Sequence, residues 1–354
     1  MSMAGGFGHI RAGEALLDFA KEHLPQTHVE HVDIADIDPP LKKYSKLYDI
    51  ISKKSPLLWE IIYKFPPMFF VFRELIATRK LFNHAILDYI NGKKPDVLIF
   101  TNVIMLPMFA VACKKMLPHS TLVVVVTDYH GHSYYRFSCI DYYFVATVSV
   151  AKDLETAGIE KEKIMVTGIP VNPRFYVKEN IHDLKSKYCI NNDFPVVVCI
   201  TSFRASKHHL VTMVKSLLEF KQKINVVCLT NGNKEFYETL KNNFSGNKRF
   251  LLENWTNTIE EYIKISDVVI SKAGGLTVSE CLALQKPLIM VNPIPGQEEY
   301  NAAFVEENNF GVRVNNMNEV STVLPAMMVL SKHNQMALLP QENPCEKIFQ
   351  YILK

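Results

Sequence analysis

The sequence predicts an α/β protein with two doubly wound parallel sheets. Short Val- and Ile-rich segments alternate with helical segments, and this alternation occurs in two successive sets. A segment rich in Gly and Pro, G-I-P-V-N-P-R-F at residues 168–175, separates the two sets. Short apolar strands joined by helical crossovers are typical of parallel sheets with helices on both faces.

The individual elements follow from this alternation. In the first set, strands are expected at residues 97–101, 122–127, 142–146 and 163–167, and helices at 107–116 and 150–157. In the second set, strands are expected at 196–201, 226–230, 267–270 and 287–291, and helices at 207–221, 234–243 and 277–284. A last helix is expected at 345–353.

Length and composition predict two domains of ordinary size. The chain has 354 residues and 48% hydrophobic content, enough for a large core. We expect an N-terminal domain at 1–170, a C-terminal domain at 171–340 and a terminal helix at 341–354. No apolar run approaches the roughly 18 residues of a membrane span, and no signal-peptide pattern opens the chain, so a cytoplasmic protein is expected. The seven cysteines form no C-x-x-C pair, so neither a zinc site nor a disulfide framework is indicated.

The run S-K-A-G-G-L-T-V-S-E at residues 271–280 places two glycines between a strand and a helix. At Gly274 and Gly275 the helix N-terminus would present free N–H groups and the positive end of its dipole, which favour an anion such as a sugar diphosphate. Glu280 is expected to face the same site. Alternatively, Thr277 and Glu280 form a capping box, in which the carboxylate only satisfies the Thr277 N–H.

A second polar run follows the strand that ends at Asn292. The loop and the residues after it carry Gln297, Glu298 and Asn301. Loops beyond the ends of parallel strands are where α/β proteins bind ligands. Together the two runs predict a nucleotide-sugar site and hence a glycosyltransferase.

Residues 41–94 combine positive charge with large apolar side chains. They include nine Lys and two Arg against two Asp and two Glu. Their aromatic residues include Trp59, Tyr63, Phe69 and Phe70. Such a mixture suits an anionic bilayer surface. The other interpretation, a core helix with a lysine-solvated face, is slightly favoured by the pattern alone. No nucleic-acid partner is expected.

Six motifs in order resemble the diacylglycerol glycosyltransferases, from residue 5 to about 313. They are G-G-F-G-H at 5–9, V-V-T-D-Y at 125–129, D-Y-Y-F-V-A-T at 141–147, T-G-I-P-V-N-P-R-F at 167–175, the glycine run at 271–280 and N-P-I-P-G-Q-E at 292–298. This family includes bacterial processive diacylglycerol glucosyltransferases and plant-type monogalactosyldiacylglycerol synthases, relatives of the lipid II N-acetylglucosaminyltransferase. The resemblance implies a GT-B fold, in which two Rossmann-like domains face a central cleft.

The resemblance also implies roles for single residues. A UDP-sugar would bind the C-terminal domain, with Glu280 on the ribose and the glycine turn against the diphosphate. Gln297 and Glu298 would contact the sugar, and the backbone near Trp255 would read the uracil base. A diacylglycerol or glycolipid acceptor would bind the N-terminal domain. Residues 41–94 would then contact the membrane peripherally.

The expected chemistry is direct displacement at the anomeric carbon with inversion. His9 is the expected base, since an imidazole with an ordinary pKa near 6.5 suits proton transfer at neutral pH. Asp128 would assist His9 or orient the acceptor, or it would only cap a loop. Arg204 and Lys207 are candidate cations for the diphosphate. No metal or other cofactor is expected, because His130 and His132 have no apparent third ligand.

Three departures from the family pattern qualify these expectations. Only residues 1–4 precede the glycine loop, so the N-terminal sheet is expected to lack its first strand, with a true start codon upstream. Bulky Phe203 replaces glycine in the loop after residue 200, and Asn172 replaces an arginine. A UDP-sugar epimerase, a lipid II-type transferase and a non-catalytic nucleotide-sugar-binding protein remain as alternatives.

Overall fold

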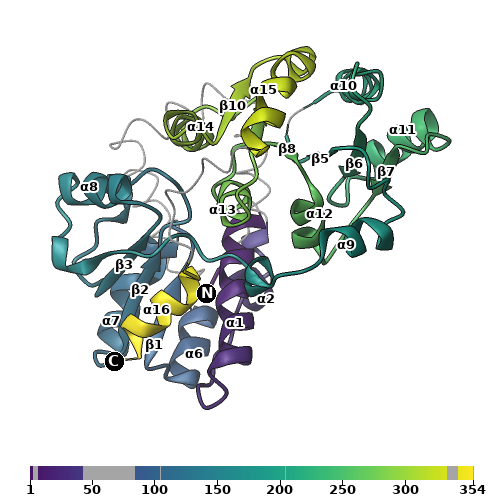
Figure 1. The fold of residues 1–354 in the computed structure, drawn as a ribbon. Coiled ribbons are helices and arrows are strands. Elements are labelled where there is room, and N and C mark those ends of the chain that lie inside the picture. The colour runs from purple at the N-terminus through teal and green to yellow at the C-terminus, as the bar shows by residue number, and fades with distance from the viewer. Residues whose placement is uncertain (3–6, 43–83, 104, 204, 333–341, 354) are drawn as a thin grey trace. The chain divides into compact units, whose positions relative to one another are not determined.

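The computed structural model describes residues 1–2, 7–42, 84–103, 105–203, 205–332 and 342–353. The chain forms two compact units (Figure 1). The first consists of Met1–Pro173, Ile294–Tyr300 and Glu342–Lys354, and the second consists of Arg174–Pro293 and Asn301–Gln341. Each unit has its own parallel sheet.

The first unit contains a four-stranded parallel sheet in sequential order. Its strands are β1 (Val97–Phe100), β2 (Thr121–Val125), β3 (Tyr142–Val145) and β4 (Ile164–Val166). Beside β1, the backbone of residues 1–2 forms hydrogen bonds on both sides, and Ser2 makes an isolated parallel bridge with Asp33. Thr101 N donates to Met1 O at 3.2 Å, and Ser2 N donates to Val32 O at 2.9 Å. Residues 1–2 therefore lie between β1 and residues 32–34, at the place where the sequence predicted a missing central strand.

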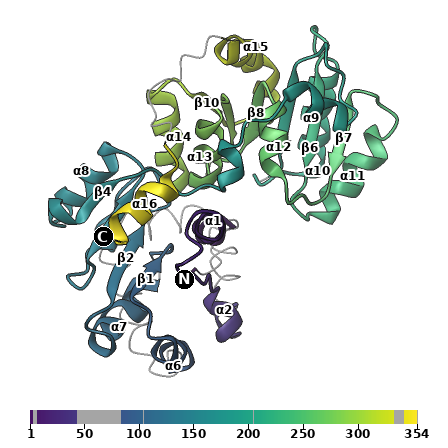
Figure 2. The same ribbon diagram turned by 60° about the horizontal axis from the view of Figure 1, so that its bottom comes forward.

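The first unit also contains helices (Figure 2). They are α1 (Phe7–His23), α2 (Ile34–Ile37), α6 (His84–Lys93), η1 (Leu106–Ala110), α7 (Val111–Met116), α8 (Val148–Thr156) and α16 (Pro344–Ile352). The rings of Phe19 in α1 and Phe349 in α16 stack with centroids 5.8 Å apart. Both rings belong to a core cluster that also contains Val123, Val125 and Phe144 of the sheet. No helix among the described residues is long and apolar enough to cross a membrane.

The second unit contains a six-stranded parallel sheet in the order β10-β9-β8-β5-β6-β7. Its strands are β5 (Val196–Ile200), β6 (Asn225–Leu229), β7 (Phe250–Glu253), β8 (Val268–Ser271), β9 (Leu288–Val291) and β10 (Gly311–Val314). The predicted α/β class with two parallel sheets is confirmed. The two edge strands, β7 and β10, were not predicted.

The helices of the second unit are α9 (Ile181–Lys187), α10 (Lys207–Leu218), α11 (Lys234–Phe244), α12 (Ile259–Ile265), α13 (Gly275–Ala283) and α15 (Val320–Lys332). Helix α14 (Gln297–Glu307) begins in the first unit and continues in the second from Asn301. Polar side chains fix several starts: Asn233 accepts from Phe236 N at 3.1 Å in front of α11. At the sheet edge, the Arg313 guanidinium on β10 pairs with Glu306 Oε2 at 2.7 Å.

Candidate functional site

His9 lies in the first turn of α1, and two threonines hold its ring. The Nδ1 atom of His9 is 2.8 Å from Thr101 O and 2.8 Å from Thr127 Oγ1. Thr101 directly follows β1, and Thr127 follows β2 by two residues. Both contacts therefore come from the carboxyl edge of the sheet, where parallel α/β folds bind ligands.

These contacts determine the tautomer of His9. A backbone carbonyl can only accept a hydrogen bond, so the contact with Thr101 O requires a proton on Nδ1. In the neutral imidazole the basic lone pair then lies on Nε2. The arrangement can therefore accept a proton at Nε2 while Nδ1 keeps the ring orientation fixed.

Asp128 lies next to Thr127, and its carboxylate is buried. Its Oδ2 atom accepts a hydrogen bond from Gln297 Nε2 at 2.6 Å. Burial raises the pKa of nearby Tyr135 well above its usual value, and the negative charge of Asp128 adds to this effect. The loop after β2 thus brings His9, Asp128 and Gln297 together in the first unit.

Two glutamates at the start of α14 organise the loop in front of it. Glu298 Oε2 accepts from Ile294 N at 3.0 Å, and Glu299 Oε2 accepts from Gly296 N at 3.0 Å. The second bond is the backward half of a capping box. Glu298 was expected to contact a sugar. In the structure its buried carboxylate holds the loop backbone, and the sugar contact stays a prediction.

The glycine turn lies in the second unit, at the carboxyl end of β8. Helix α13 begins at Gly275, and Gly274 is its N-cap without any side-chain cap. Thr277 is therefore the third residue of the helix instead of its cap. The alternative capping box between Thr277 and Glu280 is wrong, because that motif needs its threonine at the N-cap. The first turn of α13 thus presents backbone N–H groups that no side chain caps.

Lys272 lies against this turn, and the sequence analysis missed it. A Cβ atom added at Gly274 would lie 3.5 Å from Lys272 Cε and 3.7 Å from its Nζ. An ammonium group thus accompanies the positive end of a helix dipole, a combination that favours a phosphate. Lys207, one of the expected cations, pairs with Glu235 at 2.6 Å, and its contact with the diphosphate stays a prediction. The other, Arg204, lies outside the described residues.

A buried side chain, that of Asn301, supports the same turn, and buried Glu280 lies in the helix that follows it. Asn301 is fully buried, and its Nδ2 donates to Ala273 O at 3.0 Å. This amide holds the backbone of the turn, and the expected ligand contact of Asn301 stays a prediction. Glu280 is 4% exposed and lies in the second turn of α13. Burying a carboxylate costs free energy unless polar groups surround it.

Trp255 lies just beyond β7, at the same sheet edge. Its side chain is 48% exposed, and its Nε1 donates to Asn257 Oδ1 at 3.1 Å. Gly232, with φ +80°, lies in the loop after β6, and a Cβ atom added there would be 3.7 Å from the Trp255 ring. An exposed indole beside a glycine loop offers a flat apolar surface for a planar group.

The two histidines of the H-x-H motif have separate partners. His130 Nδ1 lies 3.0 Å from Asp153 Oδ2, whereas His132 accepts from Tyr134 N at the start of a short 3₁₀ helix, η2 (Ser133–Tyr135). Within the described ranges, no group of three or more His, Cys, Asp or Glu residues could hold a metal ion. The expected membrane contacts Trp59, Tyr63, Phe69 and Phe70 lie outside the described residues.

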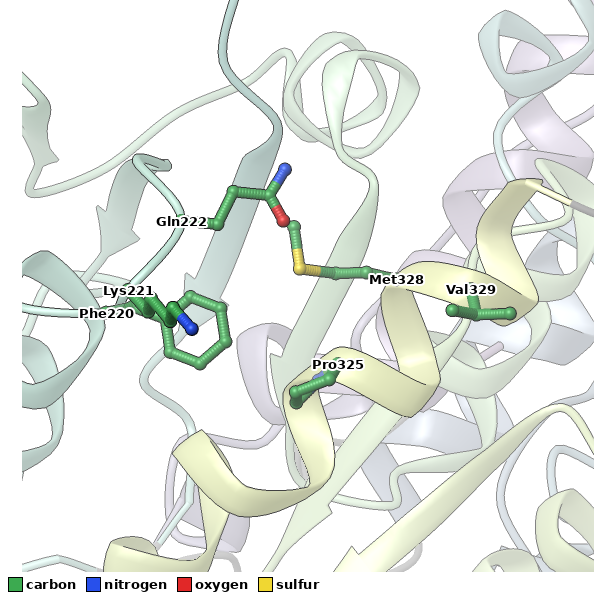
Figure 3. Close-up of a pocket in the computed structure, with 6 residues that line it drawn as sticks. All are labelled: Phe220, Lys221, Gln222, Pro325, Met328 and Val329. Atoms are coloured by element: carbon green, nitrogen blue, oxygen red, sulfur yellow. The ribbon is translucent and has the colours of Figure 1, made fainter.

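A pocket of about 540 Å³ lies elsewhere in the second unit. Figure 3 shows the residues that line it, from the loop after α10 and from α15: Phe220, Lys221, Gln222, Pro325, Met328 and Val329. The loop after α10 leads into the amino end of β6. The pocket is therefore at the sheet edge opposite to the glycine turn.

Comparisons with known proteins agree with this arrangement. Residues 9–171 match the family model of monogalactosyldiacylglycerol (MGDG) synthase, and residues 202–348 match that of the glycosyltransferase family 28 C-terminal domain. A processive diacylglycerol beta-glucosyltransferase of Staphylococcus aureus is 27% identical over 318 residues, 86% of this chain and 78% of the relative. One of the same name from Staphylococcus epidermidis is 27% identical over 241 residues, 68% of this chain but only 61% of the relative.

A solved structure shares the fold. The putative UDP-N-acetylglucosamine 2-epimerase from Listeria monocytogenes superposes with a TM-score of 0.63 at 14% identity, covering 99% of this chain and 93% of that one. The two family matches follow one another in the order of the two sheets. The chain therefore combines a region that matches the MGDG synthase family model with one that matches the glycosyltransferase family 28 C-terminal domain, in a GT-B fold.

Proposed function

We propose that this glycosyltransferase moves a hexose from a UDP-sugar to diacylglycerol or to a glycosyl-diacylglycerol, with inversion. The observation that carries the proposal is the geometry of His9, whose Nδ1 is held by Thr101 O so that the basic lone pair lies on Nε2. The names of the Staphylococcus relatives support a lipid acceptor and a β-linked product. Since UDP-hexoses of this kind carry an α-linked sugar, a β product requires inversion.

On the acceptor side, the lipid hydroxyl gives its proton to His9 Nε2 while its oxygen attacks the anomeric carbon. A neutral histidine base fits this step, because its charge changes near physiological pH. Asp128 does not contact the proton in this scheme. It holds Gln297 through the 2.6 Å bond, and Gln297 contacts the sugar.

On the donor side, the bond between the anomeric carbon and the diphosphate breaks, and UDP leaves with its bonding electron pair. The uncapped N-terminus of α13 and the ammonium of Lys272 would stabilise the negative charge that develops on the diphosphate. Glu280 would accept hydrogen bonds from the ribose hydroxyls, and Trp255 would lie against the uracil base. The reaction in this form needs no metal ion or other cofactor.

The proposed acceptor is a membrane lipid, so the enzyme would work at a membrane surface. Peripheral association would rest on residues 41–94, with their excess of Lys and Arg and their aromatic side chains. Anionic lipids would then strengthen binding, and salt would weaken it.

The test is product formation on vesicles that contain diacylglycerol and an anionic lipid. UDP-glucose, UDP-galactose and UDP-N-acetylglucosamine would be supplied separately, with lipid II as an alternative acceptor. A β-linked glycosyl-diacylglycerol supports the proposal, and the productive donor identifies the sugar. Transfer only to lipid II, or UDP-sugar binding without transfer to any acceptor, would overturn it.

A further inference from the structure

His130 is held from two sides within the first unit. Its Nδ1 lies 3.0 Å from Asp153 Oδ2 on α8, and its ring stacks on Tyr300 with centroids 3.9 Å apart and planes inclined by 11°. Asp153 Oδ2 also accepts from Gly131 N at 3.0 Å. One carboxylate therefore fixes both the imidazole and the backbone next to it. The rings of His130 and His132 are nearly perpendicular, with centroids 6.1 Å apart.

We propose that His130 is a positioning residue that holds residues 294–300, and through them Gln297, in the geometry that receives the sugar. The inference rests on the proposed function. Residues three apart in a helix lie on the same face, so Gln297 and Tyr300 point the same way in the first turn of α14. They meet Asp128 and His130, two residues of one loop.

The hydrogen bond between Asp128 and Gln297 and the stacking of His130 on Tyr300 restrict different movements. The hydrogen bond to Asp128 sets the amide orientation of Gln297: with Nε2 donating, the amide oxygen is the atom that would accept from a sugar hydroxyl. A single hydrogen bond still allows the helix turn to pivot about it. The broad face-to-face contact of His130 with Tyr300 opposes that rotation, and Asp153 prevents the imidazole from turning away.

Hydrogen exchange tests the attachment without any substrate. The reporter is the backbone amide of Tyr300, which donates to Gly296 O at 3.3 Å. We expect His130→Ala and Tyr300→Ala to accelerate exchange at residues 296–301 by about tenfold, because local opening becomes easier. Tyr300→Phe keeps the ring and should exchange like the wild type. His132→Ala, in the same loop but stacked on Tyr134, is the matched control. Unchanged exchange in both alanine variants at positions 130 and 300 would overturn the proposal.

Kinetics test the consequence. In His130→Ala we expect KM for the UDP-sugar to rise about fivefold with little change in kcat, as for a lost aromatic contact. His130→Ala combined with Tyr300→Ala should be no worse than either change alone, because the two rings act as one contact. A fall in kcat at constant KM would instead show a direct role in the chemistry and overturn the positioning role. If the wild type transfers no sugar to any acceptor, the proposed function fails, while the exchange result still decides the attachment.

Discussion

The residues around His9 and those around Gly274 have different proposed tasks. The first group would act through side chains and the second mainly through the backbone. In the proposed mechanism, side chains of the first unit do the chemistry, and hydrogen bonds hold them in place, as Thr101 and Thr127 hold His9. In the second unit, the backbone of the glycine turn would form the binding surface, and Lys272 would add a positive charge to it. A proton transfer requires one basic atom at a fixed position. Binding a diphosphate requires several hydrogen-bond donors and a positive electrostatic potential.

This difference predicts different kinetic signatures. Changes around His9 should lower kcat with little effect on donor affinity, since they affect only the transition state. Changes around Gly274 should act on donor affinity as well as on departure of the diphosphate. The following experiments separate the two groups of residues.

The largest effect is expected from His9→Ala. Loss of the general base should lower kcat by roughly 10²- to 10⁴-fold, with donor affinity nearly unchanged. Steady-state kinetics combined with calorimetric titration of UDP would measure both quantities. His23→Ala, at the other end of the same helix, is the matched control and should retain activity. Equal losses in the two variants would mean that the helix was damaged and would remove His9 from the mechanism.

Lys272→Met should have the next largest effect. Removing the ammonium beside the start of α13 takes away charge stabilisation of the diphosphate, so kcat/KM should fall by about 10- to 100-fold. Lys207→Met serves as the comparison, because Lys207 is paired with Glu235 and should matter little. If Lys207→Met caused the larger loss, the diphosphate would have to lie against α10 instead.

Glu280→Ala should weaken UDP binding by about tenfold, the value of one hydrogen bond to a charged group. Calorimetric titration with UDP measures it directly. Glu280→Gln keeps an acceptor oxygen at the same place and should lie between the wild type and the alanine variant. UDP affinity equal to the wild type in both variants would leave Glu280 without a role in the donor site.

The smallest effect is expected from chelation of divalent metals. With α13 and Lys272 meeting the charge of the diphosphate, an excess of EDTA should leave the transfer rate within about twofold of its original value. The rate would be followed before and after dialysis against the chelator. A large loss that Mg²⁺ or Mn²⁺ restores would show that the second unit does not neutralise the diphosphate alone.

The central strands could be predicted from the sequence because fully buried strands appear in it as short runs of apolar residues. Strands β5 and β6 are buried at every position, and their Val-rich segments were recognised. The edge strands β7 and β10 are partly exposed, so F-L-L-E and G-V-R-V resemble surface segments when only the sequence is available. A partly exposed edge strand lacks the continuous apolar run by which a buried strand is recognised in sequence.

The site was predicted less completely, for a different reason. His9 and the two glycines lie in recognisable motifs, but Lys272 looks like an ordinary surface lysine in sequence. Only the backbone geometry of the turn places its ammonium near Gly274. In the same way, the sequence did not predict that the Asn301 amide holds the Ala273 carbonyl, and the ligand contact of Asn301 stays a prediction. Both features depend on side-chain direction, which sequence spacing does not determine.

The edge strand β10 also affects how copies of this protein meet one another. An open parallel edge invites a strand from a second molecule, and such pairing leads to aggregation. β10 has only four residues, and its third, Arg313, is engaged by Glu306 through both its backbone N and its guanidinium. A foreign strand would have to displace this charged pair before it could extend the sheet. We therefore expect the ion pair at Arg313 to hinder strand pairing between copies of this protein in crowded solution.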